Sequence, residues 1–250
     1  VTGASKGLGL AMARTFAAAG ADVAIVARRP DALAEAKRAI EAAAPGRTVV
    51  AIAADVSRAE QIGLVWRQAQ AGLGKVDILV NNAGTSATGA FESITDEKWQ
   101  EDFELKLFAA VRLCRLALPG MKERRWGRVL NVLNSGAKAP APGGAPTAVT
   151  RAAGMALTKV LAGEFAPHNV LVNALCTGIL VSEQWETRHR RVAADQPFAQ
   201  FIAEAGKQVP LGRMGDPQEF ANLACFLASD AASYVTGCAI NVDGGKSPVV

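Results

Sequence analysis

Cysteine, histidine and tyrosine are scarce in this chain, and their scarcity limits the kinds of site it can hold. The sequence has four cysteines, two histidines and one tyrosine among 250 residues. The cysteines are scattered and form no Cys-x-x-Cys pair, so the sequence indicates no metal site. We expect buried, reduced thiols in a cytoplasmic protein.

Long hydrophobic runs and basic stripes are also missing. No apolar run approaches the roughly 20 residues that a membrane-spanning helix needs. The net charge of +4 is mild, and the basic residues form no stripe interleaved with aromatics. We therefore expect neither a membrane nor a nucleic acid as a partner. Half of the residues are hydrophobic and a fifth are charged, which is ordinary for a soluble globular enzyme with a small-molecule substrate.

Short β-branched runs alternate with longer helical patterns along the chain. Most of the runs are apolar without alternation, which is typical of parallel strands covered on both faces. The predicted strands are Asp22–Ala27, Thr48–Ala54, Val76–Val80, Arg128–Leu133, Val170–Leu175 and Ala239–Val242. The pattern predicts one α/β domain spanning residues 1–250, with a doubly wound, Rossmann-like parallel sheet. Only residues 178–217 depart from it, and we expect them to form a lid over the substrate.

A glycine-rich segment, Thr2-Gly3-Ala4-Ser5-Lys6-Gly7-Leu8-Gly9, lies where a first strand should end and a helix begin. Glycines let a backbone approach a pyrophosphate, and a helix N-terminus offers unpaired N–H groups. At the first strand–helix junction of a repeated βα pattern, this loop predicts a dinucleotide-phosphate site. The expected contacts are Gly3, Ser5, Lys6, Gly7, Leu8 and Gly9.

The residues after the second strand indicate which dinucleotide binds. An NAD site usually has a carboxylate here to accept hydrogen bonds from the ribose hydroxyls. This chain has Ala27 instead, followed by Arg28 and Arg29, while Lys6 lies in the phosphate loop. A guanidinium matches phosphate geometry, so three cations without an acid favour the 2′-phosphate of NADP over NAD.

Further motifs follow in order and resemble those of the short-chain dehydrogenase/reductase family, in particular 3-oxoacyl-ACP reductases. The spacing Gly-x-x-x-Gly-x-Gly, the run Asn81-Asn82-Ala83-Gly84 and the C-terminal Val242-Asp243-Gly244-Gly245 carry the resemblance. It implies an oxidoreductase that is often a homotetramer. It also implies cofactor contacts at Asp55, Val56, Asn82, Ala83, Gly84, Gly178 and Leu180.

The four residues that carry out the chemistry in that family are all replaced here. The family uses a Tyr-x-x-x-Lys pair, a serine thirteen residues before the tyrosine, and an upstream asparagine. Thr147 stands at the tyrosine position, Arg151 at the lysine position and Lys106 at the asparagine position. Counting back thirteen residues from Thr147 gives Asn134, with Ser135 one residue later. A threonine hydroxyl is a poor proton donor at neutral pH.

Three functions fit these replacements. The first is NADP(H)-linked carbonyl reduction or alcohol oxidation with a non-standard proton relay. In that relay Lys106 would supply the proton, Ser135 or Thr147 would orient the substrate, and Arg151 would hold ribose or phosphate oxygens. The second is a catalytically inactive NADP(H)-binding protein. The third is a non-redox lyase or hydratase that keeps the nucleotide as a structural element.

The lid segment carries Trp185, Phe198 and Phe201 beside the basic run Arg188-His189-Arg190-Arg191. Aromatics next to cations suit an apolar substrate with an anionic group, such as an acyl thioester. A solvated helix face is the alternative, and it is the commoner origin of such charge runs.

Overall fold

The computed structural model describes all residues 1–250 and contains six strands that pair only in parallel. These are β1 (Val23–Ala27), β2 (Val49–Ala53), β3 (Ile78–Asn81), β4 (Gly127–Asn134), β5 (Val170–Thr177) and β6 (Ala239–Val242). Every predicted strand is present. The largest boundary differences are at Val76, where β3 begins at Ile78, and at Leu175, where β5 continues to Thr177.

The strands form a two-stranded sheet, β1-β2, and a four-stranded sheet, β3-β4-β5-β6. The first four residues lie between the two sheets and join them. Val26 N donates to Val1 O at 3.0 Å on one side, and Thr2 N donates to Val80 O at 3.0 Å on the other. This segment marks the central position of a doubly wound sheet, and the predicted Rossmann-like fold is confirmed.

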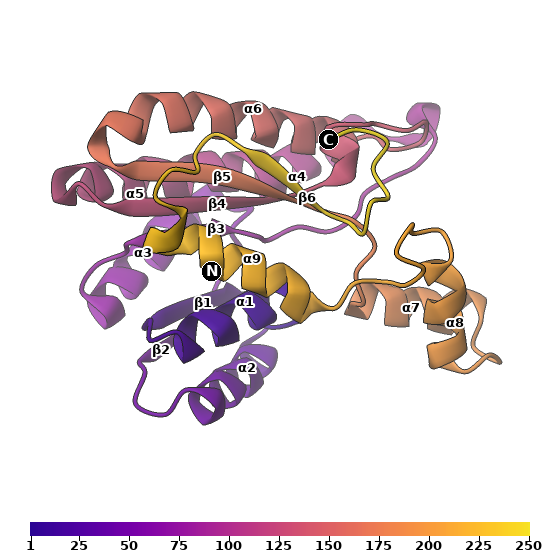
Figure 1. The fold of residues 1–250 in the computed structure, drawn as a ribbon, viewed down its shortest axis with the longest axis horizontal. Helices are drawn as coiled ribbons and strands as arrows, with labels where there is room; N and C mark the ends of the chain where they lie inside the picture. Colours follow the sequence, from indigo (N-terminus) through magenta and orange to yellow (C-terminus); the bar gives the residue numbers. More distant parts are fainter.

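Six long helices cover the two faces of this sheet (Figure 1). The helices α1 (Gly7–Ala18), α2 (Pro30–Ala43) and α9 (Pro217–Ala228) cover one face, and α3 (Ala59–Leu73), α5 (Ala109–Arg124) and α6 (Thr147–Phe165) cover the other. Successive side chains of a strand point to opposite faces. In β1, Val23 and Ile25 therefore join the first core, whereas Ala24 and Val26 join the second.

The remaining elements lie at the ends of the sheet or in its connections. The helix α4 (Asp96–Phe103) runs through a π-helical turn, Glu104–Phe108, directly into α5. Single 3₁₀ turns cover Phe91–Ser93, Ser135–Ala137, Ala166–His168 and Asp230–Ala232. None of the helices has the length and apolar character that crossing a membrane would require.

The expected lid segment contains two helices, α7 (Glu183–Val192) and α8 (Phe198–Gly206), which lie beyond the carboxyl end of β5 (Figure 1). The two ends of the segment meet, because Val181 N donates to Gly215 O at 2.9 Å. The segment therefore leaves the sheet and returns to nearly the same place. Its action as a lid stays a prediction.

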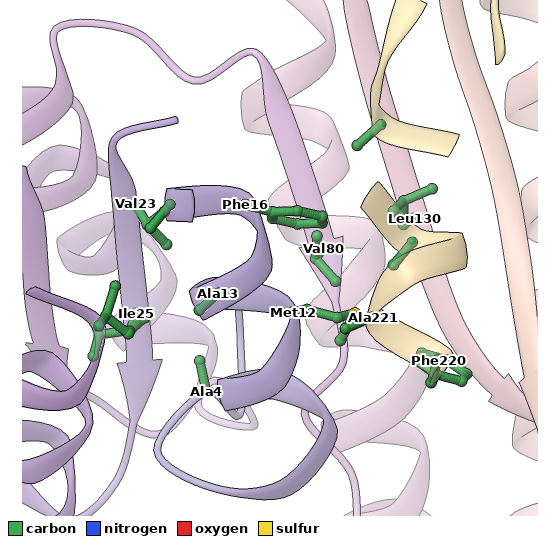
Figure 2. Packing of buried hydrophobic residues seen from close by; sticks show 14 of the residues in the cluster. Ala4, Met12, Ala13, Phe16, Val23, Ile25, Val80, Leu130, Phe220 and Ala221 are labelled. Carbon is green, nitrogen blue, oxygen red and sulfur yellow. The ribbon is translucent and has the colours of Figure 1, made fainter. Parts of the chain in front are cut away.

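The core between α1, α9 and the sheet is closely packed. Figure 2 shows Met12 and Phe16 of α1, Val80 and Leu130 of the sheet, and Phe220 of α9 converging on it. Phe220 is fully buried, whereas Phe226 on the same helix is 44% exposed. Burial of an aromatic side chain between two helices and a sheet should contribute strongly to the free energy of folding.

We expect Phe220→Ala to lower the free energy of unfolding by about 3–5 kcal/mol, because it removes a buried ring and leaves a cavity. The control Phe226→Ala should change it by less than about 1 kcal/mol, since surface substitutions rarely do more. Denaturant titration followed by circular dichroism measures both values. Equal losses in the two variants would contradict this assignment of the core.

Candidate functional site

A single large cavity of about 670 Å³ opens at the carboxyl ends of the parallel strands, where doubly wound sheets bind their ligands. It brings together every residue that the sequence suggested for the cofactor. These are Gly3, Ser5, Lys6, Gly7, Leu8, Gly9, Arg28, Arg29, Asp55, Val56, Asn82, Ala83, Gly84, Arg151, Gly178 and Leu180.

The phosphate loop enters this cavity at the start of α1. The N-cap residue Lys6 makes no side-chain capping bond, and the first turn of the helix holds no acidic residue. Gly7 has a φ of +52°, and a Cβ placed on it would meet no protein atom within 4 Å. The loop therefore leaves open space in front of a helix N-terminus, which fits a pyrophosphate.

A set of hydrogen bonds holds this loop against the end of β3. Thr2 Oγ1 accepts from the backbone N–H groups of Asn82 at 2.9 Å and of Ala83 at 3.0 Å. In return, Asn82 Nδ2 donates to Thr2 O at 2.8 Å. A Cβ on Gly9 would lie 2.7 Å from Asn82 Nδ2. Only glycine therefore lets α1 approach this closely.

Charged residues also line the cavity. Arg28 and Arg29 follow β1, and Lys6 belongs to the phosphate loop. Glu183, the first residue of α7, also lines the cavity and pairs with Lys6. Sequence reasoning did not find Glu183, because more than 170 residues separate it from the phosphate loop.

A buried polar cluster lies at the family's catalytic position. Lys106 Nζ donates to Thr147 Oγ1 at 2.8 Å and pairs with Asp102, which in turn accepts from Thr150 Oγ1 at 2.6 Å. The side chain of Lys106 is fully buried and that of Asp102 is 2% exposed. Asp102 and Thr150 were not among the predicted site residues, since a lone acid or threonine on a helix gives no signal of its position.

Burial lowers the pKa of Lys106, and the nearby charge of Arg151 acts in the same direction. The hydrogen bond and the charge of Asp102 oppose both effects. The Lys106 ammonium therefore releases its proton more readily than the ammonium of an ordinary lysine.

Of this pair, only Thr147 lines the cavity, because Lys106 is not part of the wall. Thr147 Oγ1 donates to Ala87 O at 2.9 Å and accepts from Ala87 N at 2.9 Å as well as from Lys106. Its single proton and both lone pairs are therefore engaged within the protein.

Arg151 lies on the cavity wall, four residues after Thr147. Its Nη1 donates to Val132 O, its Nε has no partner, and a side chain at Gly84 would collide with its Nη2. Burial lowers the pKa of Arg151 to about 10. The guanidinium thus keeps one buried donor, Nε, that the protein leaves without a partner.

Asn134 and Ser135, the two neighbouring candidates, differ in their position relative to the cavity. Asn134 is the last residue of β4 and lines the cavity, and its Oδ1 is buried without a hydrogen-bond partner. Ser135 begins the following 3₁₀ turn and is not part of the cavity wall. The predicted role of Ser135 therefore has no geometric support here, whereas Asn134 is in position to contact a ligand.

In the expected lid, Trp185 alone among the aromatics lines the cavity. Its ring lies 5.9 Å from that of Phe201, and the guanidinium of Arg188 lies 5.1 Å from its centroid. None of the residues in the basic run 188–191 lines the cavity. An anionic substrate tail bound by this run stays a prediction.

The fold and the cavity together define a dinucleotide-binding protein of the doubly wound α/β class. A family model described as enoyl-(acyl carrier protein) reductase matches residues 3–247. D-beta-hydroxybutyrate dehydrogenase of Cupriavidus necator is 40% identical over 252 residues, covering 98% of this chain and 95% of its own. The chain belongs to the short-chain dehydrogenase/reductase family.

Two solved structures are similar over the full chain. L-Sorbose reductase from Gluconobacter frateurii, complexed with NADPH and L-sorbose, superposes with a TM-score of 0.95 at 35% identity, covering 100% of this chain and 96% of that one. An NADPH-bound short-chain oxidoreductase from Pseudomonas aeruginosa PAO1, described as containing an atypical catalytic center, gives a TM-score of 0.92 at 38% identity with the same coverage.

The phosphate loop can be tested with two glycines that both have left-handed backbone angles. Gly7 and Gly46 both have a positive φ and open space around a built Cβ, but only Gly7 lines the cavity. Gly7→Ala should weaken dinucleotide binding at least about tenfold, because its methyl group enters the phosphate space. Gly46→Ala should leave binding unchanged while lowering the melting temperature by a similar amount. If Gly7→Ala binds NADPH like wild type in calorimetric titration, the loop is not the phosphate site.

Proposed function

We propose that this protein is an NADP(H)-dependent oxidoreductase that interconverts a small carbonyl compound and its alcohol. The cations Lys6, Arg28 and Arg29 in the cavity lining, and the absence of an acid directly after β1, support NADP(H) over NAD(H). The NADPH complexes of two similar structures support the same cofactor. When bound, NADP(H) supplies or accepts the hydride.

The observation that carries this proposal is the contact between Lys106 Nζ and Thr147 Oγ1 at 2.8 Å. In reduction, the Lys106 ammonium would pass a proton to Thr147 Oγ1 while the Thr147 hydroxyl turns its own proton from Ala87 O toward the substrate oxygen. A lowered lysine pKa makes the ammonium a better donor near neutral pH. The threonine hydroxyl then relays the proton and need not ionise.

Asn134 and Arg151 would support this step electrostatically. Both line the cavity. The Arg151 Nε–H is a buried donor without a partner in the protein, whereas the unpartnered atom of Asn134 is the acceptor Oδ1, so any donor from Asn134 would be its Nδ2. With Lys106 and Arg151 positive and Asp102 negative, the buried cluster has one excess positive charge. Fixed donors and positive charge stabilise the alkoxide-like oxygen that develops during hydride transfer.

A catalytically inactive NADP(H)-binding protein is the second candidate, and one observation favours it. The backbone of Ala87 both donates to and accepts from Thr147 Oγ1, so the hydroxyl has no free proton in this arrangement. Turnover then requires this pairing to open. Spectrophotometric assay of NADPH oxidation with a panel of ketones and oxoacyl thioesters separates the two candidates, since only the enzyme turns over.

The proton relay predicts a particular pH dependence. Ketone reduction should slow as the pH rises through the lowered pKa of Lys106, because only the ammonium donates. Lys106→Met combined with Asp102→Asn, which removes both charges of the buried ion pair together, should lose about 10²–10⁴-fold in kcat and remove that alkaline decline. Lys98→Met, an exposed lysine on α4, is the control. Turnover that survives the double substitution with its pH profile intact would exclude Lys106 as the donor.

A second comparison tests which residue contacts the substrate oxygen. Asn134→Ala should lower kcat/KM for ketone reduction by about 10²-fold, as the loss of one donor to a developing oxyanion does. Its sequence neighbour provides the matched control, and Ser135→Ala should stay within about twofold of wild type, because Ser135 does not line the cavity. A larger loss of kcat/KM in Ser135→Ala than in Asn134→Ala would instead assign the contact with the substrate oxygen to Ser135.

A further inference from the structure

An ion pair crosses the cavity between the phosphate loop and the expected lid. It joins Lys6 Nζ to Glu183 Oε1, and the two side chains are 40% and 47% exposed. Lys6 precedes α1, and Glu183 is the first residue of α7. The pair therefore connects the phosphate loop to α7, a helix that is distant from it in the sequence.

Glu183 is surrounded by cations from three segments of the chain. The hydrogen bond from Lys6 holds the pKa of the Glu183 carboxyl below its usual range, and the charges of Lys6, Arg29 and Arg190 act in the same direction. Arg190 lies two turns after Glu183 on α7, so both residues are on the same helix face. Lys6 and Arg29 are also two of the three cations proposed for the 2′-phosphate.

We infer that Glu183 is a specificity-determining residue for the cofactor, because its carboxylate pairs with Lys6, one of the cations proposed for the 2′-phosphate, and must be displaced from it when NADP(H) binds. A carboxylate and a phosphate compete for the same ammonium and repel each other. A ribose 2′-hydroxyl, by contrast, can donate to a carboxylate, as it does in sites selective for NAD.

Glu183 thus supplies, from α7, the acid that is missing after β1. It lowers the preference for NADP(H) that Lys6, Arg28 and Arg29 would otherwise produce. Because displacement breaks the contact between α7 and the phosphate loop, binding of NADP(H) is also linked to the position of α7. This inference rests on the proposed cofactor.

The test measures NADPH and NADH dissociation constants by calorimetric titration, without turnover. Glu183→Gln should tighten NADPH binding about three- to fivefold, which is the size expected for removal of a half-exposed charge. NADH binding should stay the same or weaken. Glu186→Gln, an exposed acid on the same helix turn that does not line the cavity, is the control and should change neither constant.

A double-substitution cycle tests whether the Glu183 carboxylate and the 2′-phosphate compete for Lys6. In a Lys6→Met background, Glu183→Gln should have a smaller effect on NADPH affinity than in wild type. If wild type binds NADPH but Glu183→Gln binds it no more tightly, the inference is overturned and the proposed cofactor stands. If wild type binds no NADPH, both the cofactor proposal and this inference fail.

Discussion

The site depends on the hydrogen bonds between Thr2 and the residues that follow β3. Thr2 Oγ1 accepts from two consecutive backbone N–H groups, those of Asn82 and Ala83, and Asn82 Nδ2 returns a bond to Thr2 O. The segment that carries Thr2 also bonds to β1 and so joins the two sheets. Without this connection, the phosphate loop and the wall at Gly84 would have no fixed relation, and the cations proposed for the cofactor would not share a cavity with Thr147 and Arg151.

The buried cluster is the second constraint, because three charged groups share a space with little access to water. Isolated buried charges are strongly unfavourable, and a buried pair is tolerated when every polar atom finds a partner. Lys106 has two partners and Asp102 has two, so these residues fix the π-helical turn before α5 against α6. Two of the protein's five buried side-chain atoms without a partner, Arg151 Nε and Asn134 Oδ1, belong to residues of the cavity wall.

Local sequence patterns were sufficient for the fold and for most of the cofactor site. Apolar runs with helical stretches between them indicated every strand, since strands buried on both faces need little more than β-branched residues of the right length. The phosphate loop and the Arg28–Arg29 pair that the order of motifs suggested line one cavity, and their contacts with a cofactor stay predictions. Alignment with the family pattern identified Thr147 and Arg151, which line that cavity. The alignment favoured Ser135 over Asn134 because of its residue type, whereas Asn134 is the one of the two that lines the cavity.

The sequence by itself determined the class of fold, the position of the phosphate loop and the replacement of the family's catalytic residues, because each is encoded by neighbouring residues in a short pattern. Only the tertiary structure decided that Asp102 and Thr150 support Lys106, that Ala87 engages Thr147, and that Glu183 meets Lys6. Those contacts join α4 to α6, a loop to α6, and α7 to the phosphate loop. They depend on how packed helices and loops are oriented in space, and no local pattern of residues specifies that orientation.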